Sequence, residues 1–153
     1  MMDTYLDTNA LARMFVPQIG SDPILYEDFQ NFSGIPVTPL LRMETLNTFQ
    51  RLVFEFRNRS PWRVTPEIVA VAKSLFEENL QQGIALQAIP LELHTLDPVF
   101  ERITDQHVAK HGFRTYDILH VASALQLGCK KFLTFDKKAA SLAKLEGLEC
   151  VGV

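Results

Sequence analysis

The stretch that decides the fold runs from residue 115 to residue 136 and reads TYDILHVASALQLGCKKFLTFD. Apolar residues recur in its first half at three- and four-residue steps, which predicts a helix over residues 115–127 with one buried face. Gly128 ends that helix, and the run over residues 131–135 predicts a short buried strand. Asp136 follows directly. We therefore expect a helix and a strand of an α/β fold, with an acid at the carboxyl end of the strand.

The same alternation of strands and helices is expected along the rest of the chain. Further strands are predicted at residues 4–6, 35–38, 84–90 and 149–151. Helices are predicted to begin near Asn9 and at Asp22-Pro23, and to cover residues 41–59, 65–83, 97–110 and 137–145, with a loop at residues 60–66. This order predicts one mainly parallel sheet with helices on both faces, in which the ligand site lies at the carboxyl ends of the strands.

Two of these helices carry apolar residues at helical spacing, which predicts one buried face for each. The helix over residues 41–59 is expected to bury Met43, Leu46, Phe49, Val53 and Phe56. The helix that begins at Pro66 is expected to bury Ile68, Ala72, Leu75, Phe76 and Leu80.

Length and composition limit the classes of protein. The chain has 153 residues, so residues 1–153 are expected to form a single domain. Two cysteines are too few for a disulfide framework, and no apolar run approaches the roughly 20 residues that a membrane span needs. The start of the sequence lacks the segments of a signal peptide, so a cytoplasmic protein is expected. The net charge of −3 argues mildly against binding nucleic acid through charge alone.

Four acids stand at predicted strand ends or helix starts: Asp7, Glu44, Asp117 and Asp136. Each alone has an ordinary structural explanation, because carboxylates cap helices and suit the positive end of the helix dipole. As a set they indicate chemistry, since a parallel α/β fold places these positions along one rim. Converging carboxylates repel one another, and a divalent cation with oxygen ligands relieves that repulsion. The set therefore predicts a metal site that activates water against a phosphodiester.

The segments around these acids resemble the four motifs of the PIN domain family, in the same order. They read YLDTNAL at residues 5–11, LRMETLN at 41–47, RTYDILHVASAL at 114–125 and FLTFDK at 132–137. The resemblance runs from near residue 3 to near residue 152 and implies a flavodoxin-like α/β/α sandwich. It also implies that the four acids bind Mg²⁺ or Mn²⁺. Asn9 and Thr134 match the polar positions beside the first and fourth acids.

The resemblance further implies an activity and partners. Small PIN-like proteins are commonly VapC-like toxins of toxin–antitoxin pairs, which are metal-dependent endoribonucleases that form homodimers and are silenced by an antitoxin protein. RNA is the implied substrate. Five apolar residues are candidates for a dimer or antitoxin surface if they are exposed: Phe15, Phe29, Phe32, Leu52 and Phe54. Residues 66–83 add a helical piece that the most compact members lack, which leaves the substrate and antitoxin surfaces open.

Several basic residues and histidines lie close in sequence to the acids. Arg42, Arg114 and Lys137 are candidates for phosphate binding, and an ordinary solvated charge or ion pair is an equal alternative for each. His120 is three residues after Asp117, so it could reach the rim, although its mostly apolar helix favours packing.

Three alternatives keep the α/β fold but change the function. A catalytically inactive PIN-like module would bind protein or RNA, although all four acids are present. A haloacid-dehalogenase-type phosphohydrolase would use Asp7 as a nucleophile, but it would need a second Asp where this chain has Asn9. A receiver domain would need a second acid beside Asp7, and Asp3 lies on the wrong side of the strand.

Overall fold

The structure, a computed structural model, describes residues 2–16, 31–59 and 63–152. The predicted helix start at Asp22-Pro23, the candidate surface residue Phe29 and part of the predicted loop, residues 60–62, lie outside the described residues. The described strands are β1 (Thr4–Leu6), β2 (Ile35–Val37), β3 (Leu86–Ala88), β4 (Lys131–Leu133) and β5 (Glu149–Val151). All stand where the sequence predicts strands, and β2, β3 and β4 are shorter than expected.

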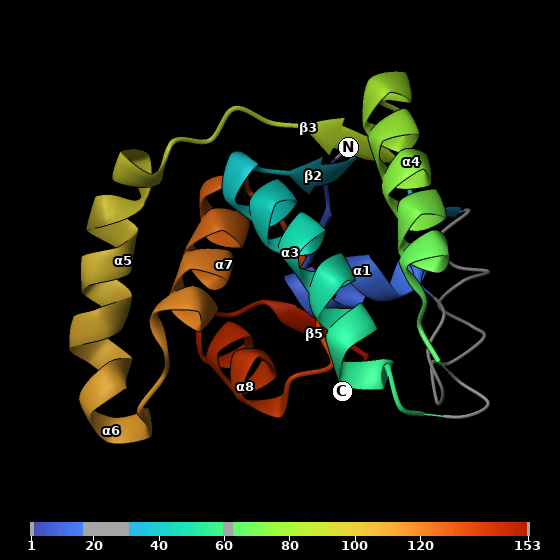
Figure 1. Cartoon of the computed structure of the whole chain (residues 1–153). Coiled ribbons are helices and arrows are strands. Elements are labelled where there is room, and N and C mark those ends of the chain that lie inside the picture. Colours follow the sequence, from blue (N-terminus) through green and yellow to red (C-terminus); the bar gives the residue numbers. More distant parts are fainter. Residues whose placement is uncertain (1, 17–30, 60–62, 153) are drawn as a thin grey trace.

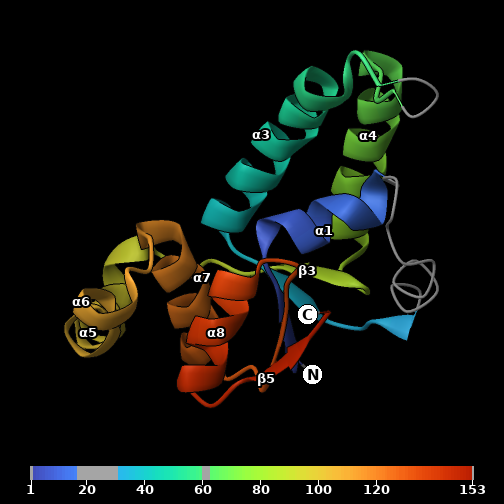
Figure 2. The ribbon, with the colours of Figure 1, turned by 90° about the horizontal axis from the view of Figure 1, so that it is seen from below.

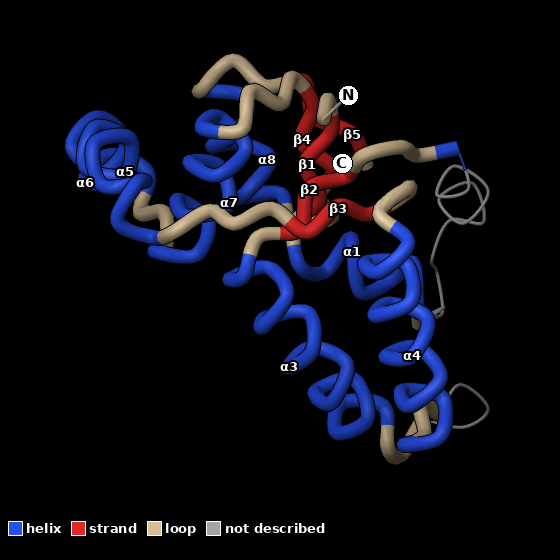
Figure 3. The backbone as a smooth tube through the Cα atoms, turned by 90° about the horizontal axis from the view of Figure 1, so that it is seen from above, coloured by secondary structure: helices blue, strands red, loops and turns tan. Residues whose placement is uncertain are grey.

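Every described strand pairing is parallel, which confirms the predicted fold class. β4 lies between β1 and β5, β2 pairs with β3, and β1 contacts β2, so the strands follow the order β3-β2-β1-β4-β5 in two hydrogen-bonded parts (Figure 3). Leu6 of β1 lies opposite Leu133 of β4. The two strands therefore end at the same edge of the sheet.

The described helices are α1 (Thr8–Phe15), α3 (Pro39–Phe56), α4 (Pro66–Gln82), α5 (Asp97–Ile103), α6 (Ala109–His111), α7 (Thr115–Gln126) and α8 (Lys137–Leu145), with a 3-10 turn η1 (Leu93–Leu96) and a π turn η2 (Thr104–Val108). The helix predicted over residues 97–110 thus forms as α5, η2 and α6. Helices α7 and α8 pack on one side of the strands with α5 outside α7, and α1 and α4 lie on the other side (Figures 1 and 3). Helices α3 and α4 project together from the strands as an arm (Figure 2).

Helix α3 begins two residues before the predicted start at Leu41. The Thr38 hydroxyl accepts a hydrogen bond from the backbone N–H of Leu41 at 3.2 Å, and Pro39 occupies the first turn. Helix α4 begins in the same way, with Thr65 accepting from Ile68 at 3.2 Å ahead of Pro66. A threonine cap followed by proline therefore sets both starts, because proline needs no hydrogen-bond partner there.

The predicted buried stripes of α3 and α4 are partly wrong. In α3 the buried residues are Leu41, Thr45, Phe49 and Leu52, whereas Met43 is 60% exposed. The stripe is rotated because Thr45 is buried: its hydroxyl donates to the Leu41 carbonyl at 2.7 Å and so needs no water. Counting apolar residues alone passes over this threonine and selects Met43 instead.

In α4 the buried residues are Val69, Ala72 and Phe76, whereas Ile68 and Leu75 are largely exposed. Phe76 fixes this face, because its ring meets Phe15 and Phe49 edge-on at centroid distances of 5.5 and 6.0 Å. This aromatic cluster ties α1, α3 and α4 together. Of the candidate surface residues, Leu52 is buried, Phe15 and Phe32 are partly buried, and Phe54 is 65% exposed.

Two expectations from composition can be compared with the fold. Cys129 and Cys150 are both free thiols, and burial raises the pKa of Cys129 to about 11. Among the described residues, no helix combines the length and the hydrophobicity that crossing a bilayer requires.

Candidate active site

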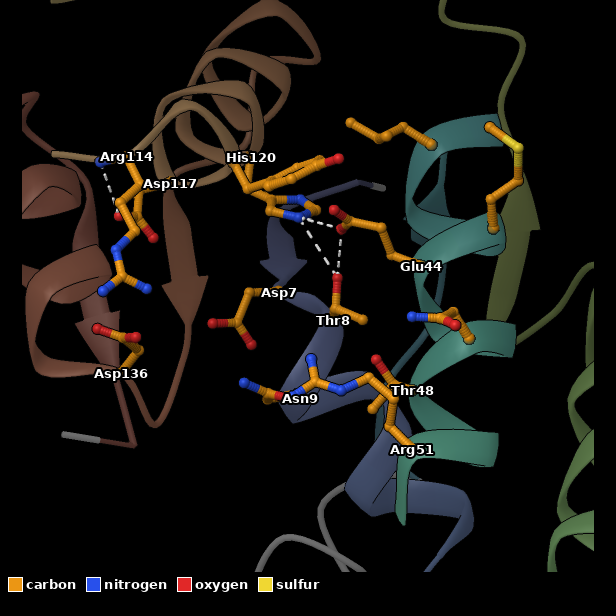
Figure 4. Close-up of a pocket in the computed structure, with 14 residues that line it drawn as sticks. Asp7, Thr8, Asn9, Glu44, Thr48, Arg51, Arg114, Asp117, His120 and Asp136 are labelled. Atoms are coloured by element: carbon orange, nitrogen blue, oxygen red, sulfur yellow. Dashed lines mark hydrogen bonds and ion pairs between the residues drawn. The ribbon is translucent and has the colours of Figure 1, made fainter. Parts of the chain in front are cut away.

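A cleft of about 570 Å³ opens at the edge where β1 and β4 end, between α3 and α7 (Figure 4). All four predicted acids line it. Asp7 follows β1, Glu44 comes from α3, Asp117 from the first turn of α7, and Asp136 from the loop after β4. The other lining residues are Thr8, Asn9, Leu40, Met43, Asn47, Thr48, Arg51, Arg114, Tyr116 and His120. Four segments far apart in sequence therefore bring their carboxylates to one concave surface.

Asp7 lies at the centre of this surface and is only 6% exposed. Its backbone N–H donates to the Leu133 carbonyl at 3.2 Å, which extends the β1–β4 ladder by one step. Its Oδ1 accepts from the backbone N–H of Ala10 at 2.9 Å and caps α1, and its Oδ2 accepts from the Thr134 hydroxyl. The helix-cap explanation is therefore correct for Asp7, and it does not remove Asp7 from the cleft.

Asp136 is also both a helix cap and a cleft residue. Its Oδ1 accepts from the backbone N–H groups of Lys138 and Ala139 at 2.7 and 3.1 Å, which caps α8. The Asp136 backbone N–H donates to the Thr134 hydroxyl oxygen at 3.0 Å. Thr134 therefore connects the two aspartates, because its hydroxyl donates to one carboxylate and accepts from the other residue's backbone.

Asp117 completes this side of the cleft. Its Oδ2 accepts from the backbone N–H of Arg114 at 3.2 Å, so it too fastens a helix start. Figure 4 shows Asp117 and Asp136 on one side of Asp7 and Glu44 on the other. In the side-chain positions of the described residues, no three of His, Cys, Asp or Glu gather closely enough to hold a metal ion. The acids thus share a cleft without forming a closed cluster.

Glu44 is held by two donors that meet on one oxygen. His120 Nε2 lies 2.5 Å from Glu44 Oε2, and the Thr8 hydroxyl donates to the same oxygen at 2.6 Å. The other ring nitrogen, Nδ1, lies 2.8 Å from the Tyr5 hydroxyl. Glu44 on α3 is thereby connected to α7 and to β1.

The electrostatics differ between the two sides of the cleft. Burial raises the pKa of Asp7, the nearby Asp136 charge adds to the rise, and the hydrogen bonds from Thr134 and Ala10 oppose it. Burial also disfavours ionised Glu44, but the hydrogen bond and charge of His120, together with Thr8, hold the pKa of Glu44 below its ordinary value. Of these two carboxylates, Asp7 therefore gains more from a nearby cation.

The predicted phosphate-binding residues separate in the structure. Arg114 lines the cleft. Arg42 instead pairs with Glu77 of α4 at 2.5 Å, and Lys137 lines a different depression with Ser141 and Lys144. Arg51 lines the cleft from α3 and pairs with Glu55 at 2.9 Å. Positive charge therefore reaches the cleft from both walls, through Arg51 and Arg114.

The sequence did not predict that His120 and Thr8 contact Glu44 in the cleft. The apolar character of α7 favours packing for His120, yet the ring contacts Glu44 in the cleft. Its spacing from Asp117 carried the signal, since residues three apart share a helix face. Thr8 gave no signal beyond following Asp7.

Comparisons with solved structures identify the fold. The chain is similar to VapBC2 from Rickettsia felis, solved bound to a DNA fragment from their promoter, with 12% identity, a TM-score of 0.59 and 98% of both chains covered. It is similar to FitAcB from Neisseria gonorrhoeae, with 13% identity, a TM-score of 0.58, and 97% of this chain and 96% of that chain covered. For PAE2754 from Pyrobaculum aerophilum the identity is 16%, the TM-score 0.56 and the coverage 98% and 90%. At these identities the likeness shows a shared fold.

The family match is made by the sequence itself. No curated protein matches this sequence significantly. Residues 4–145, however, match the PIN domain family, and this span contains all four acids of the cleft. Because the match covers nearly the whole chain and agrees with the fold, this protein belongs to the PIN domain family.

Proposed function

We propose that this protein is a divalent-metal-dependent endoribonuclease that hydrolyses phosphodiester bonds of RNA in the acidic cleft. PIN domains are generally nucleases. The observation that carries the proposal is that Asp7, Glu44, Asp117 and Asp136 line one cleft at the carboxyl ends of parallel strands. A nuclease needs to place negative phosphate beside these carboxylates, and a cation between them removes that conflict.

The donor set fits a hard cation such as Mg²⁺ or Mn²⁺, which takes carboxylate oxygens as ligands. Capping α8 uses only Oδ1 of Asp136, and the bond to Arg114 uses only Oδ2 of Asp117. A carboxylate has lone pairs on both oxygens, so each aspartate can cap a helix and still bind a cation. Rotation of the more exposed side chains, Asp117 and Asp136, would gather the acids around an ion.

We assign a role to each residue on the basis of its position in the cleft. Asp7, Asp117 and Asp136 would hold the ion, while Glu44 would complete the site and orient the attacking water. Thr134 fixes Asp7, and Asn9 lines the cleft beside it. Arg51 and Arg114 attract the phosphates on either wall. A divalent cation held by these carboxylates would supply a more acidic bound water and would stabilise charge on the phosphate.

We further propose that the protein is a cytoplasmic, homodimeric toxin with a cognate antitoxin protein as partner. The VapC-like motifs and the fold shared with VapBC2 and FitAcB support this role. Phe54 near the end of α3 is a candidate contact residue, because a large exposed aromatic side chain gains from being covered. Light scattering of the purified protein tests the dimer, with a monomer as the contrary result.

Cleavage of a mixed pool of structured RNA tests the enzymatic proposal. The purified chain is incubated with Mg²⁺ or Mn²⁺, with a chelator, and as the Asp117→Asn variant. We expect cleavage that needs the metal and is lost in the variant. Cleavage that survives in both the chelator and Asp117→Asn would contradict the site, and RNA binding without cleavage in any metal would favour an inactive PIN-like module.

A further inference from the structure

A buried chain of polar contacts crosses the back of the cleft from β1 through α7 to α3. The Tyr5 hydroxyl meets His120 Nδ1 at 2.8 Å, and His120 Nε2 meets Glu44 Oε2 at 2.5 Å. Tyr5 is fully buried and His120 is nearly so. Figure 4 shows His120 on α7 reaching across to Glu44 on α3, with Thr8 below them.

The chemistry of the carboxylate fixes the direction of the hydrogen bond between His120 and Glu44. Ionised Glu44 can only accept, so the hydrogen of the short contact belongs to His120 Nε2. The Tyr5 hydroxyl meets the other ring nitrogen, Nδ1, at 2.8 Å, and a hydroxyl can donate to that nitrogen or accept from it. The imidazole is then held from both sides, in one orientation.

His120 and Thr8 both donate a hydrogen bond to the same oxygen of Glu44. Both contacts end on Oε2, at 2.5 and 2.6 Å. The carboxylate is thereby anchored through one atom and retains Oε1 for another partner. A glutamate on a helix surface otherwise samples many rotamers, and the two donors remove that freedom before any ligand arrives.

We propose that His120 is a positioning residue for the metal site, which orients Glu44 on the opposite wall so that its free oxygen faces the cleft. Tyr5 supports the ring, and Thr8 supplies the second donor. The inference rests on the proposed function, because it assigns Glu44 to the site that binds the cation. His120 itself touches neither the ion nor the RNA.

The test compares His120→Ala with His120→Gln, whose side-chain amide can donate to Glu44 from nearly the position of Nε2. His107→Ala is the matched control, because His107 also pairs with a glutamate, Glu146, at 3.0 Å but lies outside the cleft. Affinity for Mn²⁺ is measured by calorimetry without RNA, and kcat and KM are measured with a cleaved RNA. Thermal unfolding of each variant shows whether a loss of Mn²⁺ affinity or of cleavage comes from misfolding.

We expect His120→Ala to weaken Mn²⁺ binding about 10- to 100-fold, the usual effect of removing a partner that orients a metal ligand. The kcat should fall with it, while KM for RNA changes less. His120→Gln should recover most of the affinity, and His107→Ala should match the wild type. Thr8→Val removes the second donor from a half-buried position, and it should give a smaller loss of Mn²⁺ affinity than His120→Ala. This variant also provides a test if His120→Ala does not fold.

Each contrary result has a separate meaning. Wild-type Mn²⁺ affinity in folded His120→Ala, or in Thr8→Val if His120→Ala unfolds, would overturn the inference and leave the proposed function standing. An equal loss of Mn²⁺ affinity in folded His120→Ala and folded His120→Gln would show that His120 does not act by donating a hydrogen bond to Glu44. A wild-type chain that neither binds Mn²⁺ nor cleaves RNA would overturn the proposed function and the inference together.

Discussion

Two histidine–glutamate pairs connect distant parts of this chain, and their surroundings differ. His107 of η2 meets Glu146, the residue after α8, at 3.0 Å, and Arg102 binds the same carboxylate through its two terminal guanidinium nitrogens, Nη2 at 2.5 Å and Nη1 at 3.3 Å. His120 meets Glu44 at 2.5 Å, but Thr8 takes the place of an arginine. Glu146 is neutralised by its partners, whereas Glu44 shares its cleft with three more acids.

The difference separates a structural ion pair, whose charges balance, from a cleft whose acids outnumber its arginines. The Arg102 hydrogen bond, assisted by His107, holds the pKa of Glu146 below its ordinary value, and nothing further is needed there. In the cleft the balance of charge is negative, and burial already raises the pKa of Asp7. We therefore expect added metal to affect the cleft, and loss of the Glu146 pair to affect stability alone.

Asp7→Asn should give the largest effect. Cleavage should fall by at least about 100-fold, more than the loss of an orienting partner produces. Stability at pH 7 should rise, because Asn can still accept from Ala10. The folded pKa of Asp7 lies above the ordinary value of 3.8, so wild-type stability falls as pH rises through that folded pKa, whereas Asn cannot ionise. RNA cleavage and thermal unfolding measure the two effects, and Asp105→Asn, at an exposed position, is the control. Cleavage at the wild-type rate in Asp7→Asn would exclude Asp7 as a ligand of the metal ion.

Added Mn²⁺ should stabilise the wild type but not Asp7→Asn. At a hundred times its dissociation constant the ion contributes about 2.7 kcal/mol, which for a chain of this length raises Tm by about 5–10 °C. A thermal melt with and without Mn²⁺ measures the shift. Glu146→Gln should show the same shift as the wild type, and a shift of equal size in Asp7→Asn would place the ion elsewhere.

Glu146→Gln should lower stability by about 1–2 kcal/mol at pH 7 and leave cleavage unchanged, because a neutral amide replaces a carboxylate bound by two partners. The folded pKa of Glu146 is lowered from 4.5, so its contribution is present above that value and is lost as pH falls through the folded pKa. Chemical denaturation at neutral and acid pH should show the gap to the wild type closing in acid. A difference in stability between Glu146→Gln and the wild type that grows as the pH falls would contradict a lowered pKa for Glu146.

Tyr5→Phe should give the smallest effect. Phe fits the space, because the Tyr5 ring stacks on Phe132 at a centroid distance of 5.6 Å, and only the hydroxyl that meets His120 is removed. Losing one hydrogen bond predicts a 2- to 10-fold loss of Mn²⁺ affinity, roughly 0.5–1.5 kcal/mol. Calorimetry checks the value, and a loss larger than that of His120→Ala would show that Tyr5 does not act through His120.

Much of the fold could be predicted from the sequence, because short apolar runs and capping residues act locally. The strand at residues 4–6 and the helix at residues 137–145 are found with the predicted bounds. The buried face of α3 could not be predicted in the same way. That face depends on Thr45 bonding its own helix backbone and on the aromatic cluster with α1 and α4, which are tertiary effects.

In the candidate site, too, some features could be predicted from the sequence and others depend on tertiary packing. The positions of Asp7 and Asp136 at one sheet edge follow from the strand order, so sequence reasoning could place them together. The pairing of His120 with Glu44 joins residues 76 positions apart and depends on how α3 leans toward α7. The pairing of Arg42 with Glu77 depends on α4, the segment whose role the sequence left open.

A crystal structure of the protein grown with Mn²⁺ tests the central claim most directly, because anomalous scattering locates the ion independently of activity. We expect an anomalous peak in the cleft within bonding distance of the Asp7, Asp117 and Asp136 carboxylates, with Glu44 still held by His120. A cleft without a peak, at a Mn²⁺ concentration that supports cleavage, would contradict the claim that these acids form the metal site of this PIN domain.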